Sequence, residues 1–393
     1  MGNEAFSGDL DGLRRSIDLL VRPHALHAEL PVATPVDGIG PGPTLELLSG
    51  SCLSGGRDLG APGFFAHMDP PTPWITWAMQ LWAARLNQNL LHPDTAPIAR
   101  DLERRVVEWF APIFGMGGGH MTPGSTLANL TALWAAREAG AAEVVAGANA
   151  HLSIAKGAHL LGMPYRVVED WAAPGDLSRT VAVLTAGTTS TGEIEPLDAA
   201  ASADWRHVDA AWAGPLRLSH THRHLLDGIE GADSVSVSAH KWLFQPKESA
   251  MVLFQDVEAS HDAISFCGEY LAVPNIGIQG SHGATALPLA ATVLAYGTSG
   301  IASWIDAAMR LADELWDIVE ADPDLEALSK PQTGVLNWRH KRVPVELIVE
   351  GLPASVLVSS TAIAGERWLR SVAANPMADP VLVAESVLSA AAR

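Results

Sequence analysis

A lysine with unusual neighbours follows a short strand pattern in the second half of the chain. Residues 234–238 alternate serine and valine, which is the period of a β-strand, and they lead into Ala239-His240-Lys241-Trp242. A lysine between an imidazole and an indole loses solvation, which lowers the pKa of its amine, and a neutral amine can form an imine with an aldehyde. The alternative is an ordinary lysine whose charged end reaches solvent at a strand end.

Other polar side chains follow further predicted strands. From residue 143 onward, short apolar runs alternate with helical patterns, which predicts a largely parallel sheet covered by helices. In such sheets, ligands bind at the carboxyl ends of the strands. The residues that fall just past these ends are His151, Thr188, Thr189, Asp209 and Lys241. We therefore expect one site built from several strand ends.

A turn at Pro123-Gly124 precedes another helical pattern, which Ser125 or Thr126 is expected to cap. A glycine–serine loop that opens a helix offers backbone N–H groups and a positive dipole end to a phosphate. The loop lacks the lysine of a Walker motif, and the glycines upstream lack Rossmann spacing. A plain capped helix therefore remains the alternative.

Composition limits the classes of function. The chain has 393 residues, of which 48% are hydrophobic, and this suits a folded protein with two domains. With 25 Lys and Arg against 44 Asp and Glu, the formal net charge is −19, which repels nucleic-acid backbones. The two cysteines, the absence of an apolar leader and the absence of a run of about 18 apolar residues predict a cytoplasmic protein without a membrane partner. The three histidines within 219–224 lack flanking acids or cysteines, so we expect a solvated loop and no metal site.

The order of patterns predicts three parts. Residues 1–66 form an N-terminal arm with one amphipathic helix and a proline-rich linker at 31–43, residues 67–300 form a large domain, and residues 301–393 form a linking helix and a small α+β domain. Helices are predicted at 9–21, 74–91, 95–110, 281–296, 301–319 and 379–391, and strands of the small domain at 334–338, 345–349 and 356–359.

A series of ordered segments resembles the group II pyridoxal-phosphate-dependent amino-acid decarboxylases, which include the aromatic amino-acid, glutamate, cysteine-sulfinate and diaminobutyrate decarboxylases. The resemblance runs from Phe65 to the C-terminus. Its segments are LNQNLLHPDTAPIARDLE (86–103), TPGSTLANLTAL (122–133), AHLSIAKGAHLLG (150–162), AGTTSTGEIEPL (186–197), HVDAAWAG (207–214), SAHKW (238–242), PQTGVLNWR and WLRSVAANP. It implies an α/β protein of fold-type I, with a mostly parallel central sheet in the large domain and a small C-terminal α+β domain.

The resemblance also implies roles for single residues. Lys241 is expected to form an imine with pyridoxal 5'-phosphate, and Asp209 to keep the pyridine nitrogen protonated. His151 is expected to stack on the ring, with Ala211 on its opposite face. The other cofactor-binding residues implied are Gly124, Ser125, Thr126, Thr188, Ser238 and His240, together with Gly280 and Ser281 supplied by the second chain of a homodimer.

One departure from the family concerns proton delivery. Family members carry, on a mobile loop after the lysine strand, a tyrosine that gives a proton to Cα. Here residues 266–279 are too short for that loop, and Tyr270 precedes the apparent deletion. His151 is therefore the expected donor, with Tyr270 of a partner chain as the alternative.

The main hypothesis for function is decarboxylation of an L-amino acid to its amine and carbon dioxide. The alternatives are oxidative decarboxylation-deamination to an aldehyde, an elimination at Cα, or an inactive cofactor-binding partner subunit. The substrate pocket is expected near 67–74 and 92–97, and the substrate's side chain is left open.

Overall fold

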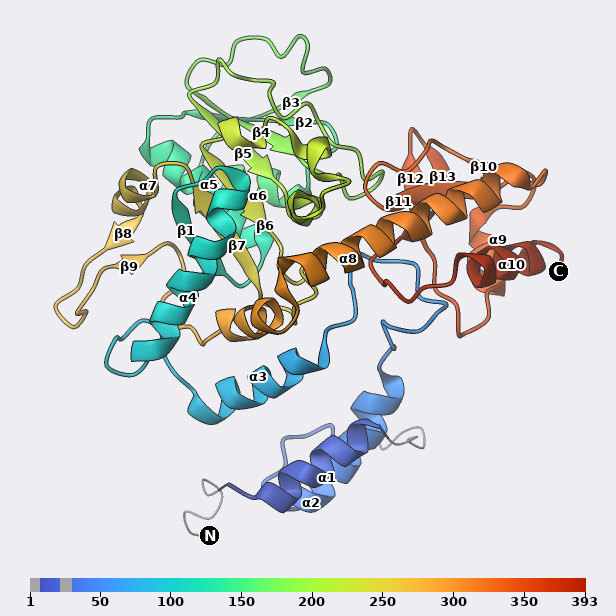
Figure 1. Ribbon diagram of the computed structural model, residues 1–393, viewed down its shortest axis with the longest axis horizontal. Coiled ribbons are helices and arrows are strands. Elements are labelled where there is room, and N and C mark those ends of the chain that lie inside the picture. Colours follow the sequence, from blue (N-terminus) through green and yellow to red (C-terminus); the bar gives the residue numbers. More distant parts are fainter. Residues whose placement is uncertain (1–7, 22–29) are drawn as a thin grey trace. The chain divides into compact units, whose positions relative to one another are not determined.

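The computed structural model describes residues 8–21 and 30–393, which belong to two compact units, 1–58 and 59–393 (Figure 1). In the first unit, α1 (Leu10–Leu20) begins where Asp9 accepts a hydrogen bond from the Gly12 N–H at 2.9 Å. This confirms the helix predicted at 9–21. Helix α2 (Pro41–Leu48) and a π-helical turn (Ser49–Leu53) follow. Helix α2 begins inside the predicted linker because proline suits the first helical position.

The second unit begins at residue 59, before the predicted end of the arm at 66. Phe64 and Phe65 are 3% and 1% exposed, so this segment is part of the core. The Phe65 N–H donates to the Leu357 carbonyl at 3.1 Å, and the Leu357 N–H donates to the Gly63 carbonyl at 2.9 Å. The resulting bridge ties the start of the unit to its C-terminal part.

A seven-stranded sheet forms the centre of the second unit (Figure 1). In spatial order its strands are β1 (Gly118–Thr122), β7 (Ala250–Phe254), β6 (Ser234–Val237), β5 (Trp205–Asp209), β4 (Thr180–Thr185), β2 (Glu143–Gly147) and β3 (Tyr165–Val168). All neighbouring pairs from β6 to β3 are parallel, and β7 runs antiparallel to β6 and β1. Strands β4, β6 and β7 are buried throughout, and β5 is buried over its last three residues, as expected for a sheet covered on both faces. The predicted mostly parallel sheet is confirmed.

Helices pack around this sheet. Helix α5 (Ser125–Glu138) contacts β6, β7 and α6 (Leu152–Leu161), and α4 (Pro97–Phe110) contacts β1. A 3-10 turn (Ala111–Phe114), α7 (Val257–Ala263) and three further 3-10 turns (Gly214–Leu218, Arg223–Leu226 and Ile229–Gly231) complete the large domain. Helix α3 (Trp74–Leu86) is shorter than predicted because Asn87 adopts the left-handed conformation, with φ of 46°, and ends it.

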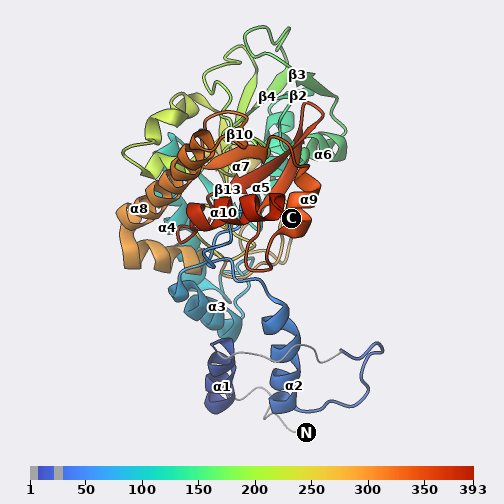
Figure 2. The same cartoon turned by 90° about the vertical axis from the view of Figure 1, so that its right-hand side faces the viewer.

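Helix α8 (Ala286–Ala321) joins the large domain to the small one (Figure 2). It is kinked at Gly297, whose φ of 68° and ψ of 170° are not helical, at the break predicted between two helices. By length and hydropathy, α8 alone among the described helices could cross a membrane. However, Ile301, Ile305 and Leu315 are fully buried in the main core, and α8 packs against α3, α4 and α10. It is therefore explained as a core helix.

The small domain is a four-stranded antiparallel sheet with two helices. Its strands, in spatial order, are β10 (Leu325–Ala327), β11 (Val335–His340), β13 (Glu366–Val372) and β12 (Ser359–Ile363), and its helices are α9 (Val345–Gly351) and α10 (Pro380–Ala391). The strand predicted at 345–349 is wrong. Pro344 precedes a helical turn there, and Val345 and Ile348, three residues apart, face the core. The strand predicted at 356–359 is displaced, since β12 begins at Ser359.

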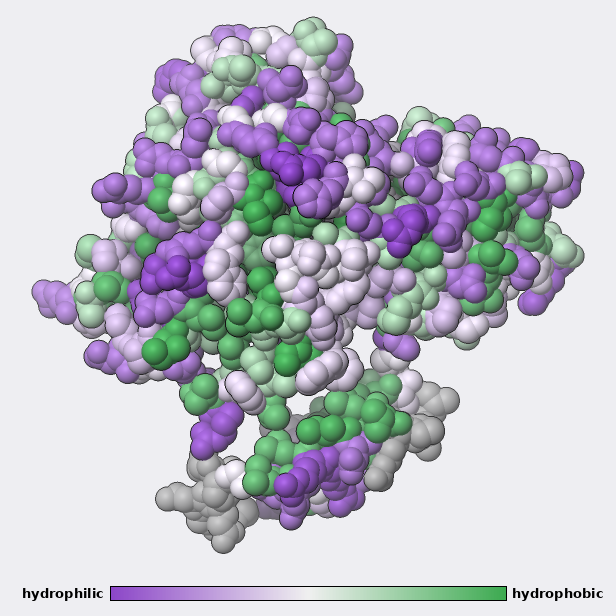
Figure 3. Space-filling model, viewed as in Figure 1, coloured by the Kyte–Doolittle hydropathy of each residue, from purple (hydrophilic) through white to green (hydrophobic). Residues whose placement is uncertain are grey.

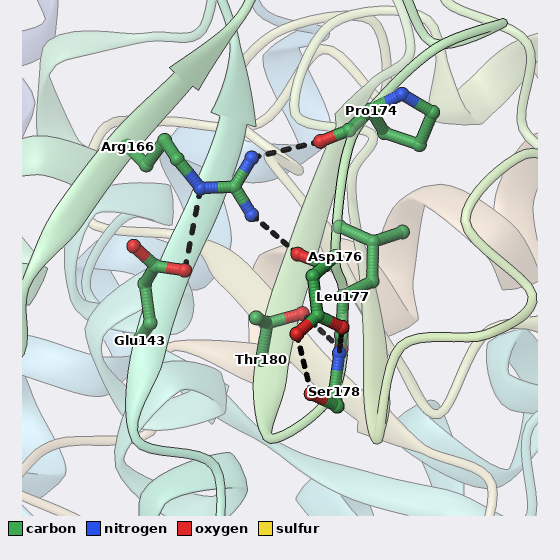
Figure 4. Close-up of polar contacts among 7 residues, drawn as sticks. All are labelled: Glu143, Arg166, Pro174, Asp176, Leu177, Ser178 and Thr180. Carbon is green, nitrogen blue, oxygen red and sulfur yellow. Dashed lines mark hydrogen bonds and ion pairs between the residues drawn. The ribbon is translucent and has the colours of Figure 1, made fainter.

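The connection from β3 to β4 contains no helix and is held by side chains instead (Figure 4). Arg166 donates to the carbonyls of Pro174 and Asp176 at 2.8 and 2.7 Å, and to the Glu143 carboxylate at 3.3 Å. Ser178 donates through its N–H and hydroxyl to Asp176, both at 2.9 Å. These bonds hold the loop that leads from the edge strand β3 back to β4, which lies between β2 and β5. The carboxyl end of β4 then contributes to the site.

Candidate functional site

The polar residues at the strand ends meet around one cavity of about 220 Å³. It is lined by Gly124, Ser125, Thr126, His151, Thr185, Gly187, Thr189, Asp209, Ala211, Trp212, Ser238, His240 and Lys241. These residues follow β1, β2, β4, β5 and β6, so distant segments converge because parallel strands end at the same edge. The predicted clustering is present in the structure.

Three expected residues do not line this cavity. Thr188 is buried, but its hydroxyl contacts the Thr191 hydroxyl at 2.7 Å, and its neighbours Gly187 and Thr189 face the cavity instead. A strand-end loop turns sharply here, because Gly187 has φ of 90°, and sequence position alone could not tell which side chain faces inward. Gly280 and Ser281 also lie outside the cavity of their own chain, and their approach to a partner's site remains a prediction.

Lys241 lies in the turn after β6 and lines the cavity. Burial lowers the pKa of its amine, and the positive charges of Lys247 and Arg370 act in the same direction. The Asp209 carboxylate opposes this effect by favouring the charged amine. A larger neutral fraction makes the lysine a better nucleophile toward an aldehyde.

Two tryptophans anchor the strand ends that carry Asp209 and Lys241. The rings of Trp212 and Trp242 stack with centroids 4.0 Å apart, and their N–H groups donate to the carbonyls of Thr333 and Ala373 in the small domain. A Cβ at Gly334 would lie 2.8 Å from the Trp242 ring, so glycine is required for this approach. The sequence suggested that Trp242 desolvates the lysine; its ring instead joins the two domains.

Asp209 presents a buried carboxylate, 3% exposed, at the end of β5. It accepts hydrogen bonds from the Asn129 amide at 2.9 Å and the Ala211 N–H at 3.1 Å, and the Ser236 hydroxyl lies 3.3 Å from it. Among the described residues no cation pairs with it within 4.0 Å. A buried charge needs an opposite charge, and a protonated pyridine nitrogen suits this position.

The start of α5 offers a cradle for a phosphate. The N-cap residue is Gly124, and no side chain caps the helix, so the predicted cap by Ser125 or Thr126 is wrong. Uncapped N–H groups at a helix start bind anions. The Ser125 and Ser238 hydroxyls meet at 2.5 Å beside this end, and His240 Nδ1 is buried without a hydrogen-bond partner. Burial lowers the pKa of His240 to about 4, so its ring is neutral and can donate one N–H.

His151 caps α6 with its own ring. Its Nδ1 accepts from the Ser153 N–H at 3.2 Å and lies 2.8 Å from the Ser153 hydroxyl. Burial lowers the pKa of His151, with Lys241 adding to the effect and Asp209 opposing it. The imidazole is therefore neutral near pH 7, with one nitrogen engaged by the protein and its ring at the cavity.

The segment expected to be too short for the family's loop is a small hairpin. Strands β8 (Ser265–Phe266) and β9 (Asn275–Ile276) pair antiparallel, and the turn between them carries Tyr270. Tyr270 is 76% exposed and lies 6.5 Å from the His92 ring, measured between centroids, rather than in the cavity of its own chain.

Arg370 is a functional candidate that the sequence reading missed. It lies on β13 and is 8% exposed, and its Nε donates to the Thr189 carbonyl at 2.7 Å, at the rim of the cavity. No carboxylate among the described residues pairs with it, and burial lowers its pKa to about 10. Its charge reaches Lys241, since it contributes to that residue's lowered pKa. The signal in the sequence was only an arginine inside an apolar strand, WLRSV.

Within the described part of the chain, no group of three or more His, Cys, Asp or Glu is placed to hold a metal ion. In the histidine-rich segment, His222 lies 3.9 Å from Asp306, and His220 and His224 are exposed. The donor groups of the main cavity are thus suited to an organic cofactor with an aldehyde, a basic ring nitrogen and a phosphate.

Comparison with known proteins agrees with this donor set. A family model described as the pyridoxal-dependent decarboxylase conserved domain matches residues 53–341. An aspartate 1-decarboxylase of Aliivibrio fischeri is 28% identical over 350 residues, which cover 71% of this chain and 64% of that protein. An L-2,4-diaminobutyrate decarboxylase of Acinetobacter baumannii is 28% identical over 378 residues, covering 79% of this chain and 74% of that protein. The chain thus spans less than two thirds of the first of these relatives.

Solved structures confirm the expected fold. The glutamate decarboxylase domain of a Vibrio parahaemolyticus diaminobutyrate-pyruvate transaminase and L-2,4-diaminobutyrate decarboxylase superposes with a TM-score of 0.82 at 21% identity, covering 99% of this chain and 95% of that one. The Oryza sativa TDC, crystallised with PLP and tryptamine, superposes with a TM-score of 0.85 at 20% identity, covering 98% of both chains.

Proposed function

Because the chain belongs to the pyridoxal-dependent decarboxylase family, we propose that it removes the α-carboxyl group of an L-amino acid as carbon dioxide and releases the amine. Family membership confirms the expectation of pyridoxal 5'-phosphate as the cofactor. When bound, this cofactor supplies an aldehyde for the amino group and a protonated ring that withdraws the electron pair left at Cα. The observation that carries the proposal is the shared cavity of Lys241, Asp209 and the uncapped start of α5.

Each group of the chain has a distinct task in this proposal. Lys241 supplies the amine that holds the cofactor before substrate arrives, and burial keeps part of that amine neutral. Asp209 would stabilise the proton of the ring nitrogen, while Ser125, Ser238 and the α5 N–H groups would hold the phosphate. His151 and Ala211, which both line the cavity, would lie against the ring.

Arg370 is proposed to hold the substrate's α-carboxylate. A buried guanidinium without a carboxylate partner attracts such a group, and Arg370 lies beside Thr189 at the cavity rim. We expect Arg370→Gln to raise KM by about tenfold or more, because a hydrogen bond to a charged group is lost. Arg370→Lys, which keeps the charge, should recover part of the loss. Unchanged steady-state KM in a folded Arg370→Gln protein would remove Arg370 from this role.

The proton for Cα is proposed to come from His151, with Tyr270 of a partner chain as the alternative. His151→Phe should keep ring stacking and carbon dioxide release while amine formation drops by about 10²-fold. Tyr270→Phe is the matched variant, and it should leave the amine yield unchanged. Loss of amine in Tyr270→Phe together with full amine in His151→Phe would assign the proton to Tyr270. Both products can be counted per turnover by mass spectrometry and carbon dioxide assay.

The pH dependence follows from the lowered pKa of His151. The imidazolium gives up a proton more readily than the neutral ring, and its fraction falls as pH rises above this lowered pKa. Amine formation should therefore increase as pH decreases toward that pKa and decline at alkaline pH. In His151→Phe, this part of the pH profile should disappear.

The reaction itself is tested with purified protein, pyridoxal 5'-phosphate and a panel of L-amino acids, with products identified by mass spectrometry. Amine with an equal amount of carbon dioxide is expected for at least one acidic, basic or aromatic amino acid. Aldehyde with peroxide and ammonia would replace the proposal by oxidative decarboxylation-deamination. No product from any amino acid, with cofactor bound, would favour an inactive partner subunit.

Assembly is proposed to be a cytoplasmic homodimer without nucleic-acid or membrane partners. Helix α3 exposes Trp74, Trp77 and Trp82, which are 54–64% exposed, and apolar side chains gather on the surface there (Figure 3). Exposed aromatic clusters of this kind mark protein interfaces. The formal net charge of −19 disfavours nucleic acid. Light scattering that shows an active monomer at micromolar concentration would contradict the dimer.

A further inference from the structure

Asn129 sits at the centre of a polar network behind the cavity. It lies on α5, is fully buried, and uses its whole side-chain amide. Its Nδ2 donates to Asp209 Oδ2 and to Ser153 Oγ, both at 2.9 Å. Its Oδ1 lies 3.0 Å from His207 Nε2 and accepts from the Ser236 hydroxyl at 2.5 Å. An amide has two donors and two acceptor sites, so Asn129 is fully satisfied in one orientation.

The contacts of Asn129 with Asp209 and with His207 determine that orientation. Burial lowers the pKa of His207 to about 4, so its ring is neutral and carries one hydrogen. Trp205 donates to the Ser234 hydroxyl at 2.8 Å, and this hydroxyl lies 2.9 Å from His207 Nδ1; it donates to that nitrogen because the amide orientation set by Asp209 places an acceptor, Asn129 Oδ1, at His207 Nε2. The single hydrogen of His207 is then on Nε2 and points to Asn129 Oδ1. Rotating the amide would set two hydrogen-bond acceptors, Asn129 Oδ1 and the Asp209 carboxylate, against each other.

The contacts of Ser153 determine which ring nitrogen of His151 carries the hydrogen. Ser153 Oγ accepts from Asn129, so its own hydrogen is directed to His151 Nδ1 at 2.8 Å. The Ser153 N–H also donates to this nitrogen, at 3.2 Å. With Nδ1 accepting twice, the hydrogen of the neutral imidazole is placed on Nε2. All donors along the path from Trp205 to His151 therefore point in one direction.

We propose that Asn129 is a positioning residue that, through this directed chain, sets the Asp209 carboxylate toward the cofactor's ring nitrogen and places the hydrogen of His151 on Nε2. The proposal rests on the proposed function, which gives the Asp209 carboxylate and the His151 imidazole their roles. Asn129 does not line the cavity. It reaches His151 through the Ser153 hydroxyl, which we call the His151 branch, and it contacts Asp209 directly, which we call the Asp209 branch.

The first test measures the protonation of the cofactor's ring nitrogen and needs no substrate. Holoenzyme is prepared with pyridoxal phosphate labelled with ¹⁵N in the ring, and the nitrogen signal reports whether the ring is protonated. We expect a protonated ring in the natural protein and a shift toward the unprotonated signal in Asn129→Leu. Asn129→Ser, which is smaller and keeps a polar group, provides the same measurement if the leucine variant does not fold. A natural-protein signal in either folded variant would overturn the Asp209 branch.

The second test separates the two branches. Ser153→Ala removes the hydroxyl that joins Asn129 to His151 and keeps the backbone N–H bond to His151 Nδ1, so the ring-nitrogen signal should stay while amine formed per carbon dioxide falls by about tenfold. Asn129→Leu should lose about 10- to 100-fold in kcat with KM within about threefold, since both branches are affected. Ser260→Ala, a buried serine of α7 outside the network, is the control and should change neither readout.

The imidazole can also be observed directly. The ¹⁵N-histidine difference spectrum between the natural protein and His151→Phe should show Nε2 protonated and Nδ1 unprotonated. A hydrogen on Nδ1, or an unchanged His151 signal and amine ratio in Ser153→Ala, would overturn the His151 branch. A protonated ring together with no amine from any substrate would reject the proposed function and leave the Asp209 branch intact.

Discussion

Lys241→Ala is expected to reduce turnover by roughly 10⁴-fold or more, because the loss of a covalent catalyst is among the most severe single changes an enzyme can suffer. The cavity should still bind pyridoxal phosphate, since the phosphate cradle at the start of α5 and the carboxylate of Asp209 are untouched. Turnover is measured as amine released, and bound cofactor as absorbance after gel filtration. Binding without turnover is the expected result.

Chemical trapping makes this prediction specific for one lysine. Borohydride treatment of the natural holoenzyme should attach the cofactor to the peptide that contains Lys241, identified by mass spectrometry. Lys247 is the matched control, because it is close in the chain but is exposed and pairs with Asp69. Lys247→Ala should keep the label and most of the activity. Label on Lys247, or on any other lysine, would contradict the assignment.

The sequence predicts Lys241 and its companions well because parallel strands impose a simple rule. Buried strands can be recognised from apolar runs, and their carboxyl ends converge, so the sequence predicts that His151, Asp209 and Lys241 lie together, as they do at the cavity. The family resemblance then predicts a role for each of these residues. The sheet, the kink at Gly297 and the final helix follow from equally local signals.

The sequence-based predictions are wrong where tertiary contacts determine the local structure. The segment 345–349 has the β-branched residues of a strand, yet Pro344 and the burial of Val345 and Ile348 on one face produce helix α9. Thr188 and Thr189 are adjacent and chemically alike, and only the turn at Gly187 determines which one faces the cavity.

Asn129 and Arg370 were missed for a related reason. Each lies far along the chain from the residues it serves, on α5 and on β13, and no local pattern marks it. An asparagine inside a helical pattern reads as a solvated residue, whereas this one is fully buried and makes four hydrogen bonds. Partners of this kind are visible only in three dimensions.

Asp209→Ala is expected to lower kcat by about 10³-fold, in line with the loss of a preorganised electrostatic group. The carboxylate is buried and accepts hydrogen bonds from Asn129 and Ala211, and no described cation pairs with it. We therefore propose that its charge is directed at the ring nitrogen of the bound cofactor. Without it, the ring loses its proton and withdraws electrons from Cα less strongly. Steady-state rates and the ring-nitrogen signal of labelled cofactor both measure this change.

A cofactor analogue can separate charge from structure. Pyridoxal phosphate methylated at the ring nitrogen carries a permanent positive charge, so it should restore part of the rate in Asp209→Ala, where the methyl group also has room. In the natural protein the same analogue should be poor, because the methyl group meets the carboxylate. No rescue in a folded Asp209→Ala protein would mean that Asp209 acts by shaping the cavity rather than by charge.

Stability provides an independent check on Asp209. A buried carboxylate that lacks an ion-pair partner destabilises the folded protein, and a bound positive ring relieves that cost. Asp209→Asn keeps the size of the side chain and removes the charge. The cofactor-free variant should therefore unfold at a higher temperature than the cofactor-free natural protein, and it should gain less on addition of pyridoxal phosphate. Equal gains in the two proteins would show that the carboxylate and the ring do not interact, whatever the effect of Asp209→Ala on the rate.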